Sequence, residues 1–248
     1  LDGRSPTEFT AQADAAPGLP LSDCRLLAPI PQPRQDVVCL GVNYYEHRDE
    51  TLASNIKYDG KLTKPIYFSK RVNRAVDPNG IIDSHSNLTG QLDYEAELAV
   101  ILSRDAKDVP TAQVKDYILG YTILNDVSAR DLQSAHQQWY FGKSLDNFTP
   151  MGPWIVTRDE LDWMPKAGIR SYVNGELRQN SSTDLMITSI ETAVHQLTQG
   201  ITLLAGTIIA MGTPSGVGMA FDPPKYMRPG DVVRCEIDGI GALENTVG

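Results

Sequence analysis

Three acidic side chains alternate along one short stretch of the chain, LDYEAELAV (92–100), which contains Asp93, Glu95 and Glu97. In a β-strand, side chains two residues apart lie on the same face, so this spacing places the three carboxylates together. Neighbouring ionised carboxylates repel each other unless water or a cation lies between them. The pattern therefore predicts either a strand face open to water or a site that holds a positive charge.

A further carboxylate stands at the end of a second apolar stretch, GYTILND (120–126), from which Asp126 is well placed to project. Carboxylates without Cys or His pairs select hard divalent cations. A site with few protein oxygens leaves room for water and substrate, which suits Mg²⁺ or Mn²⁺ better than a full Ca²⁺ cage. A Mg²⁺ or Mn²⁺ centre is therefore the alternative to a solvated acidic face.

Sequence motifs of several other common sites are absent. The chain contains no HExxH, no GxxxxGK[ST] and no GxSxG pattern, which would indicate a zinc protease, a phosphate loop or a serine hydrolase. The stretch GTPSGVG (212–218) matches neither a phosphate loop nor a dinucleotide fingerprint. We expect it to form a tight loop after a strand, with backbone amides available as donors.

Composition narrows the class of protein. The 31 acidic residues against 22 basic ones give a net charge of -9, the wrong sign for binding nucleic acid or an anionic membrane surface. No apolar run is long enough to cross a bilayer. The three cysteines have no CxxC spacing, which argues against a disulfide framework or a zinc knuckle and for a reducing compartment. We therefore expect a cytoplasmic protein.

Short β-favouring runs supply most of the elements that would hold these residues in place. They cover residues 37–40, 66–68, 92–102, 118–124, 154–156, 169–173, 207–211 and 232–238. Helical patterns are fewer and cover residues 44–53, 111–117 and 190–197. Uneven strands with few helices favour a mostly β, mixed-sheet single domain over alternating βαβ units. Residues 1–36 show no sustained period and are predicted to be a lead-in segment before a domain over 37–248.

Several stretches together resemble the fumarylacetoacetate hydrolase family, in its acylpyruvate hydrolase and 2-hydroxyhepta-2,4-diene-1,7-dioate isomerase-like branch. They occur in the family's order: CLGVNYYEH (39–47), LDYEAELAV (92–100), GYTILNDVSARDLQ (120–133), QWYFGKSLDNFTPMGPW (138–154), VNGELRQ (173–179), GTPSGVG (212–218) and PGDVVRCEIDGIGALENTV (229–247). The resemblance covers the chain from about Leu21 onward. It implies an α+β, mostly β catalytic domain with a rolled mixed sheet and a few short helices, and a homodimer.

The resemblance also implies a metal centre. At the matching positions, Glu95, Glu97 and Asp126 would bind one Mg²⁺ or Mn²⁺, with Ca²⁺ able to replace it in a crystal. Lys143 matches the family's active-site lysine. Without the family, a lysine in a Gly-Lys-Ser turn would be interpreted as a solvated surface charge.

His47 and Glu50 match the His-Glu pair of the family's lid. Their spacing lets them share one helix face, although a lone pair of this kind is more often an exposed contact. Arg130 and Gln133 match substrate-contacting positions, and Thr213 lies in the glycine-rich loop that closes the pocket. Arg130 could instead pair structurally with an acid, Asp131 or Glu97. A pocket for the substrate tail is expected near the aromatic residues Tyr45, Tyr140 and Phe141.

The implied reaction is hydrolysis of a C–C bond in a 2,4-dioxo acid of the acylpyruvate or fumarylacetoacetate type. The His47–Glu50 pair would deprotonate water, and the departing enolate would be held by the metal and Lys143. The partner is thus a small 2-oxo acid. The same site could decarboxylate an oxaloacetate-like acid or isomerise a hydroxymuconate-like one, and the motifs do not separate these reactions. A catalytically silent, metal-binding scaffold is the alternative from another class.

Overall fold

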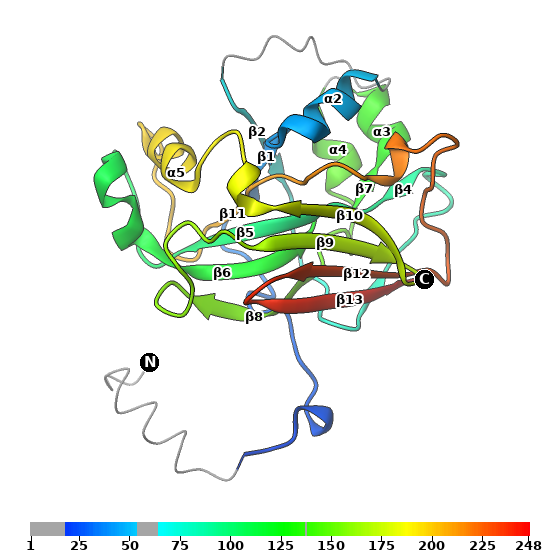
Figure 1. Cartoon of the computed structure of the whole chain (residues 1–248), viewed down its shortest axis with the longest axis horizontal. Coiled ribbons are helices and arrows are strands. Elements are labelled where there is room, and N and C mark those ends of the chain that lie inside the picture. The colour runs from blue at the N-terminus through cyan, green and yellow to red at the C-terminus, as the bar shows by residue number, and fades with distance from the viewer. Residues whose placement is uncertain (1–17, 54–63, 137) are drawn as a thin grey trace.

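Two β-sheets pack face to face in the computed structural model, which describes residues 18–53, 64–136 and 138–248 (Figure 1). The larger sheet has the order β2 (Ile66–Lys70), β1 (Val37–Gly41), β11 (Ile208–Ala210), β5 (Ala96–Leu102), β6 (Ile118–Asn125), β8 (Met151–Thr157). The smaller has the order β10 (Glu176–Ser182), β9 (Gly168–Val173), β12 (Val232–Ile237), β13 (Gly241–Val247), β3 (Ile81–Ile82). A two-stranded ladder joins β4 (Leu92–Asp93) to β7 (Ser128–Ala129). Both large sheets are mixed, because β1 pairs with β11 and β13 with β3 in parallel.

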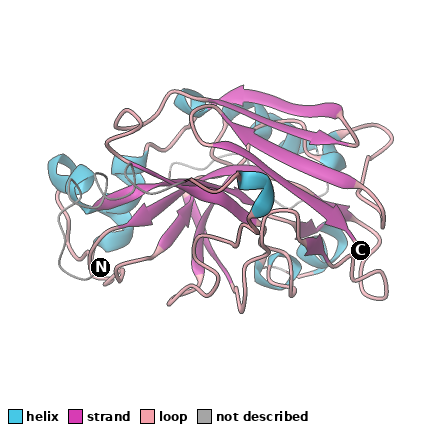
Figure 2. Ribbon diagram, turned by 90° about the horizontal axis from the view of Figure 1, so that it is seen from below, coloured by secondary structure: helices cyan, strands magenta, loops and turns pink. Residues whose placement is uncertain are grey.

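The main hydrophobic core lies between the two sheets, which Figure 2 shows one above the other. Alternate residues of β5, including Leu98 and Val100, point into this space, where they meet Ile169 of β9 and Val233 of β12. The intervening residues Ala99 and Ile101 belong to a second core on the opposite face of the larger sheet. Both faces of β5 are therefore buried, as its almost uninterrupted apolar sequence requires.

The helices lie at two ends of this layered body (Figure 1). One group consists of α2 (Tyr45–Ala53), α3 (Arg130–Ala135) and α4 (Tyr140–Lys143), and the other of α5 (Ile190–Thr198) and the 3-10 helix η2 (Thr111–Tyr117). Three further 3-10 turns are η1 (Leu21–Asp23), η3 (Thr183–Leu185) and η4 (Gly218–Ala220). Ser189 caps α5 by accepting the Thr192 N–H. Within the described ranges, no helix is long and apolar enough to cross a membrane.

The predicted fold class, a mostly β α+β domain with mixed sheets and a few short helices, is confirmed. One predicted strand, residues 92–102, is interrupted at Tyr94 and Glu95 and becomes the separate strands β4 and β5. The predicted helical segment 111–117 is a 3-10 helix. The sequence analysis missed β10, because its mostly polar residues ELRQNSS show no apolar alternation. The first 17 residues of the predicted lead-in lie outside the described residues.

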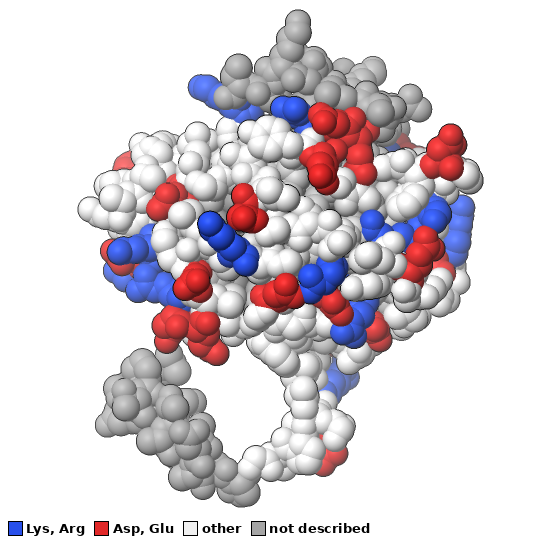
Figure 3. Space-filling model, viewed as in Figure 1, with Lys and Arg blue, Asp and Glu red and all other residues white. Residues whose placement is uncertain are grey.

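Charged side chains of both signs are interspersed over the face of the molecule that Figure 3 shows. No extended basic patch is visible among the described residues of this face, which agrees with the negative net charge.

Candidate active site

The carboxylates of Glu95, Glu97 and Asp126 lie together, with one oxygen of each within 4.8 Å of the others. Pairing of Ala96 with Asn125 sets the start of β5 beside the end of β6 and so brings the three residues to one place. All three side chains are buried, with at most 5% of each residue exposed. The solvated strand face that the sequence left open is therefore wrong.

The interruption between β4 and β5 fixes the first of these acids. The Asn125 side-chain oxygen accepts the Glu95 N–H at 3.0 Å, and the Asp126 N–H donates to the Glu95 carbonyl at 2.9 Å. Asp93, which strand periodicity placed on the same face, is not one of the three grouped acids. The backbone irregularity turns its carboxylate toward Arg130 instead.

Three buried cations surround the acidic group. The Lys143 ammonium lies 2.7 Å from Glu95 Oε2 and 2.8 Å from Asp126 Oδ2. Arg130 Nη1 lies 2.7 Å from Glu95 Oε1, and Lys70 Nζ lies 2.6 Å from Asp126 Oδ1. Each carboxylate oxygen of Glu95 and Asp126 thus has a cationic partner, with Lys143 shared between the two acids, which offsets part of the desolvation of these buried charges.

Lys70, at the end of β2, was missed in the sequence analysis. It is fully buried and also donates to the backbone carbonyls of Val127 and Lys143. The available signal was its position at the end of the apolar run IYFSK, since a buried lysine requires acidic or carbonyl partners.

Glu97 differs from the other two acids. Among the described residues, no cation lies within salt-bridge distance of its carboxylate, which accepts the Gly212 N–H at 2.8 Å. Burial raises the pKa of Glu97 well above its usual value, and the charges of Asp126 and Glu95 raise it further. Burial would also raise the pKa of Glu95, but Lys143 and Arg130 lower it to about 2.

The residues present fit a divalent cation. Three carboxylates converge on one point, and the buried charge of Glu97 lacks a counter-charge that a cation would supply. The donor set contains oxygen only, which suits Mg²⁺ or Mn²⁺ better than a metal that prefers nitrogen or sulfur.

His47 and Glu50 lie on α2, the helix that covers the pocket. His47 is 6% exposed, and its Nδ1 lies 3.2 Å from Glu50 Oε2. The other oxygen of Glu50 accepts the Gly216 N–H at 2.8 Å. The pair is therefore not an exposed surface contact, and the loop after β11 orients its carboxylate.

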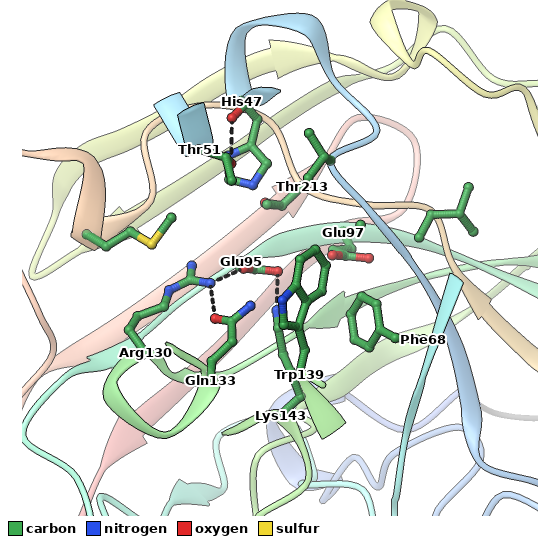
Figure 4. A pocket seen from close by; sticks show the side chains of 14 residues that line it. His47, Thr51, Phe68, Glu95, Glu97, Arg130, Gln133, Trp139, Lys143 and Thr213 are labelled. Atoms are coloured by element: carbon green, nitrogen blue, oxygen red, sulfur yellow. Dashed lines mark hydrogen bonds and ion pairs between the residues drawn. The ribbon is translucent and has the colours of Figure 1, made fainter. Parts of the chain in front are cut away.

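The three predicted substrate-contacting residues border the same pocket as Glu95, Glu97 and His47 (Figure 4). Gln133 Oε1 accepts from Arg130 Nη1 at 3.0 Å. The Thr213 hydroxyl donates to the Ala96 carbonyl and accepts from Gln179 Nε2. Arg130 pairs with Asp93 and Glu95, so the expected structural pairing with Asp131 or Glu97 is wrong.

Apolar residues close the rest of the pocket, and they differ from those expected. Phe68, Trp139 and Met219 are among the residues that line it, whereas Tyr45, Tyr140 and Phe141 are exposed and do not. A side chain on Gly41 would collide with the Trp139 indole, so glycine is required there.

Comparisons with known proteins agree on one family. A family model described as fumarylacetoacetate (FAA) hydrolase C-terminal matches residues 36–248. Oxaloacetate tautomerase YisK of Bacillus subtilis (strain 168) is 42% identical over 228 residues, which cover 92% of this chain and 74% of that protein.

Two solved structures extend this likeness to the fold. Fumarylacetoacetate hydrolase from Exiguobacterium antarcticum is 43% identical with a TM-score of 0.84, over 95% of this chain and 82% of that one. A 2-hydroxyhepta-2,4-diene-1,7-dioate isomerase from Mycobacterium marinum is 40% identical with a TM-score of 0.76, over 92% and 79% of the two chains. Similar proteins thus carry names of a hydrolase, an isomerase and a tautomerase.

Proposed function

Because this chain belongs to the fumarylacetoacetate hydrolase family, we propose that it is a divalent-metal-dependent hydrolase that cleaves a C–C bond in a 2,4-dioxo acid. The observation that carries this proposal is one pocket bordered by buried acids, a buried lysine and His47, which Glu50 contacts from behind the pocket wall. Acids can hold a metal, the pair can activate water, and the lysine can stabilise negative charge.

Glu95, Glu97 and Asp126 would hold Mg²⁺ or Mn²⁺. The bound ion would supply a Lewis acid that polarises the 2-oxo group of the substrate. Lys70 orients Asp126 from the side of the sheet by its bond to Oδ1. Lys143 holds the other oxygen of Asp126 and one oxygen of Glu95.

His47 is the general base in this mechanism. Glu50 lies at hydrogen-bond distance from Nδ1 and would hold that nitrogen as the N–H, which leaves Nε2 free to take a proton. A water molecule that loses its proton to Nε2 would attack the distal carbonyl of the substrate. The Glu50 carboxylate would stabilise the imidazolium that results.

Lys143 would stabilise the enolate of the departing 2-oxo acid. An ammonium group has three donors, and two of them go to Glu95 and Asp126. The third is available for a substrate oxygen. Arg130, Gln133 and Thr213 would position the substrate from the neighbouring walls of the pocket.

A second candidate is proton transfer or decarboxylation on a smaller 2-oxo acid such as oxaloacetate. One observation favours it, the 42% identity with an oxaloacetate tautomerase. His47 would then move a proton on the substrate carbon skeleton, and no water would be needed. Isomerisation of a hydroxymuconate-like acid would use the same proton transfer.

The test uses the full chain, stripped of metal and then supplied with Mg²⁺ or Mn²⁺. With 2,4-dioxopentanoate, we expect metal-dependent loss of the diketone absorbance and release of pyruvate and acetate in equal amounts. Oxaloacetate turnover without acylpyruvate cleavage would replace hydrolysis by the second candidate. If the protein bound metal tightly but turned over neither acid nor a hydroxymuconate, the alternative of a catalytically silent scaffold would replace both candidates.

We also propose that the enzyme is a cytoplasmic homodimer, with residues 37–248 as the catalytic domain and residues 1–36 as a lead-in segment. Three free cysteines, two of them buried, support a reducing compartment. Exposed large apolar side chains on the strands of the larger sheet, Leu119 and Trp154, support a partner surface. Light scattering coupled to gel filtration would measure the mass, and a monomer at all concentrations would contradict the dimer.

A further inference from the structure

The carboxylate of Asp93 lies between the pocket residue Arg130 and the loop segment that ends in the 3-10 helix η4 (Gly218–Ala220), whose Met219 lines the pocket. We propose that Asp93 is a positioning residue that holds Arg130 with one free guanidinium nitrogen facing the substrate, and that links this orientation to the loop. Only the identity of the substrate rests on the function proposed above.

Asp93 is fully buried at the end of β4 and accepts four hydrogen bonds. Its Oδ1 accepts the N–H of Tyr94 at 2.9 Å and of Gly218 at 2.7 Å. Its Oδ2 accepts the N–H of Met219 at 3.0 Å and Arg130 Nε at 2.9 Å. Two bonds to each oxygen fix the carboxylate plane, and with it the direction from which Nε must approach.

The guanidinium group of Arg130 is constrained at two of its three nitrogens. Nε is bound to Asp93, and Nη1 to Glu95 Oε1 and Gln133 Oε1. Because the guanidinium is planar, these bonds determine where Nη2 points. Nη2 is buried and has no hydrogen-bond partner among the described residues. Figure 4 shows Arg130 with one terminal nitrogen turned toward Glu95 and Gln133 and the other projecting toward the His47 side of the pocket.

A buried donor without a partner is rare in folded proteins, and a charged one rarer still. Since Arg130 lines the pocket, the missing partner is a ligand oxygen. The chemistry that fits a guanidinium nitrogen is an anionic oxygen, such as the carboxylate of a 2-oxo acid. Rotation of the guanidinium would aim Nη2 away from that oxygen, and the bond to Asp93 Oδ2 opposes this rotation.

The Asp93 carboxylate also holds the segment that contributes Met219 to the pocket. The Met219 side chain lines the pocket, and the backbone N–H groups of Gly218 and Met219 both donate to Asp93. Gly218 allows this approach, because a Cβ there would lie 2.6 Å from Asp93 Oδ1 and 2.5 Å from the Lys225 carbonyl oxygen. Displacement of the loop would therefore disturb Asp93 and, through it, Arg130.

The experiment compares the wild-type full chain with D93N, both loaded with Mn²⁺. Titration calorimetry measures the Kd of Mn²⁺ and then of oxalate, a dianion that resembles the carboxylate end of a 2-oxo acid. We expect oxalate to bind at least tenfold more weakly to D93N, with the Kd of Mn²⁺ within threefold of wild type. With a turned-over substrate, KM should rise by a similar factor and kcat should change less. Unchanged oxalate affinity and KM would overturn the proposal, because a merely structural role would lower only the active fraction.

Two comparisons sharpen this result. The variant R130K should lose as much oxalate affinity as D93N, and the double variant should lose little more, because both act through one guanidinium. Fully additive losses would mean that Asp93 acts elsewhere. The control D77N removes the charge of another buried carboxylate, which accepts from the Ala28 N–H and Arg25 far from the pocket, and it should bind oxalate as wild type does.

If D93N does not fold, G218A tests the same link without a charge change. Its added methyl group must displace the loop or Asp93, so oxalate affinity should fall by about threefold or more, and unchanged affinity would overturn the proposal. Failure of the proposed function is seen separately, as the absence of turnover by the wild type. A wild type that binds oxalate but turns over no 2-oxo acid leaves the oxalate comparison intact.

Discussion

The floor of the pocket and the helix that covers it are held in different ways. The floor consists of buried acids and cations from β2, β5, α4 and the residues just before β5 and just after β6. Ion pairs link all of them except Glu97, which accepts the Gly212 N–H. The cover is α2, whose residues Tyr45, Glu46 and Asp49 are exposed. Among the described residues, its side chains reach the loop after β11 by the hydrogen bonds of Glu46 and Glu50.

Because of this difference, we expect metal binding to depend on the floor and turnover to depend also on the cover. A metal site needs fixed ligands, and the pairing of β5 with β6 together with the ion pairs of Glu95 and Asp126 fixes these acids. A base that acts on water inside a closing pocket can be carried by an element with fewer contacts. Substitutions in the floor should therefore remove metal binding, whereas substitutions in α2 should spare it and slow the reaction.

The largest effect is expected for E97A. The substitution removes the carboxylate that has no cationic partner among the described residues, which is one of the three proposed metal ligands. Activity should therefore fall by about 10⁴-fold, since a metal ion contributes several kcal/mol to catalysis. Titration calorimetry should show that Mn²⁺ binding falls with activity. The exposed Glu160 supplies the control, because E160Q changes a carboxylate far from the pocket. Tight Mn²⁺ binding by E97A would contradict the assigned ligand set.

The next effect is expected for H47Q, which keeps a polar side chain but removes the base. Turnover should fall by about 10²- to 10⁴-fold, the usual contribution of general base catalysis. The Kd of Mn²⁺ should not change, because α2 lies outside the floor. A matched control is H195Q, because His195 lies on the distant helix α5, where its ring is hydrogen-bonded to the Val109 carbonyl. Loss of metal binding in H47Q would abolish the distinction between floor and cover.

A smaller effect, on stability, is expected for K70M. The substitution leaves Asp126 buried with Lys143 as its remaining cation, so the metal-free protein should lose about 3 kcal/mol of unfolding free energy. Mn²⁺ should restore part of this loss, because it supplies a positive charge at the same carboxylates. Thermal unfolding with and without Mn²⁺ measures both quantities. If Mn²⁺ raised the Tm of K70M less than that of the wild type, the restoring effect would be absent. Lys70 would then act mainly by orienting the Asp126 carboxylate and not by neutralising its charge.

The sequence predicted the residues whose positions follow from local pattern. Alternating acids in an apolar strand, and an acid at the end of the next strand, indicated a group of carboxylates that included Asp93. The family resemblance then selected Glu95, Glu97 and Asp126, which lie together in the structure. The role of Lys70 depends on contact with residues 56 and 73 positions away, which no local pattern encodes. Asp93 was assigned to the wrong group, because the irregularity at Tyr94 and Glu95 breaks strand periodicity.

The prediction that Tyr45, Tyr140 and Phe141 line the pocket was wrong for a similar reason. A short helix, α4, turns Gly142 and Lys143 inward, and Gly142 packs against Gln133 and Ala129 so closely that a Cβ would lie 2.5 Å from the Gln133 backbone nitrogen. Tyr140 and Phe141 then face outward. Which side of a four-residue helix is buried depends on the packing of α3 against it, and the sequence offers too few residues for a period to be recognised.

The smallest effect is expected for S215A, which removes one bond between the cover and the loop. Ser215 Oγ donates to Glu46 Oε2 at 2.9 Å on the surface, so its loss should cost about 0.5–1 kcal/mol of the closed arrangement and slow turnover by about two- to fivefold. E46Q should do the same, and the double variant should be no slower than either, because one bond is lost in each case. The control T157A removes a comparable surface bond, from the Thr157 hydroxyl to Glu160 at the end of β8. Steady-state kinetics at saturating Mn²⁺ measure the change. If S215A instead weakened Mn²⁺ binding, the cover and the floor would be coupled. Substitutions in α2 would then affect metal binding as well as turnover, and the distinction between the two regions would be wrong.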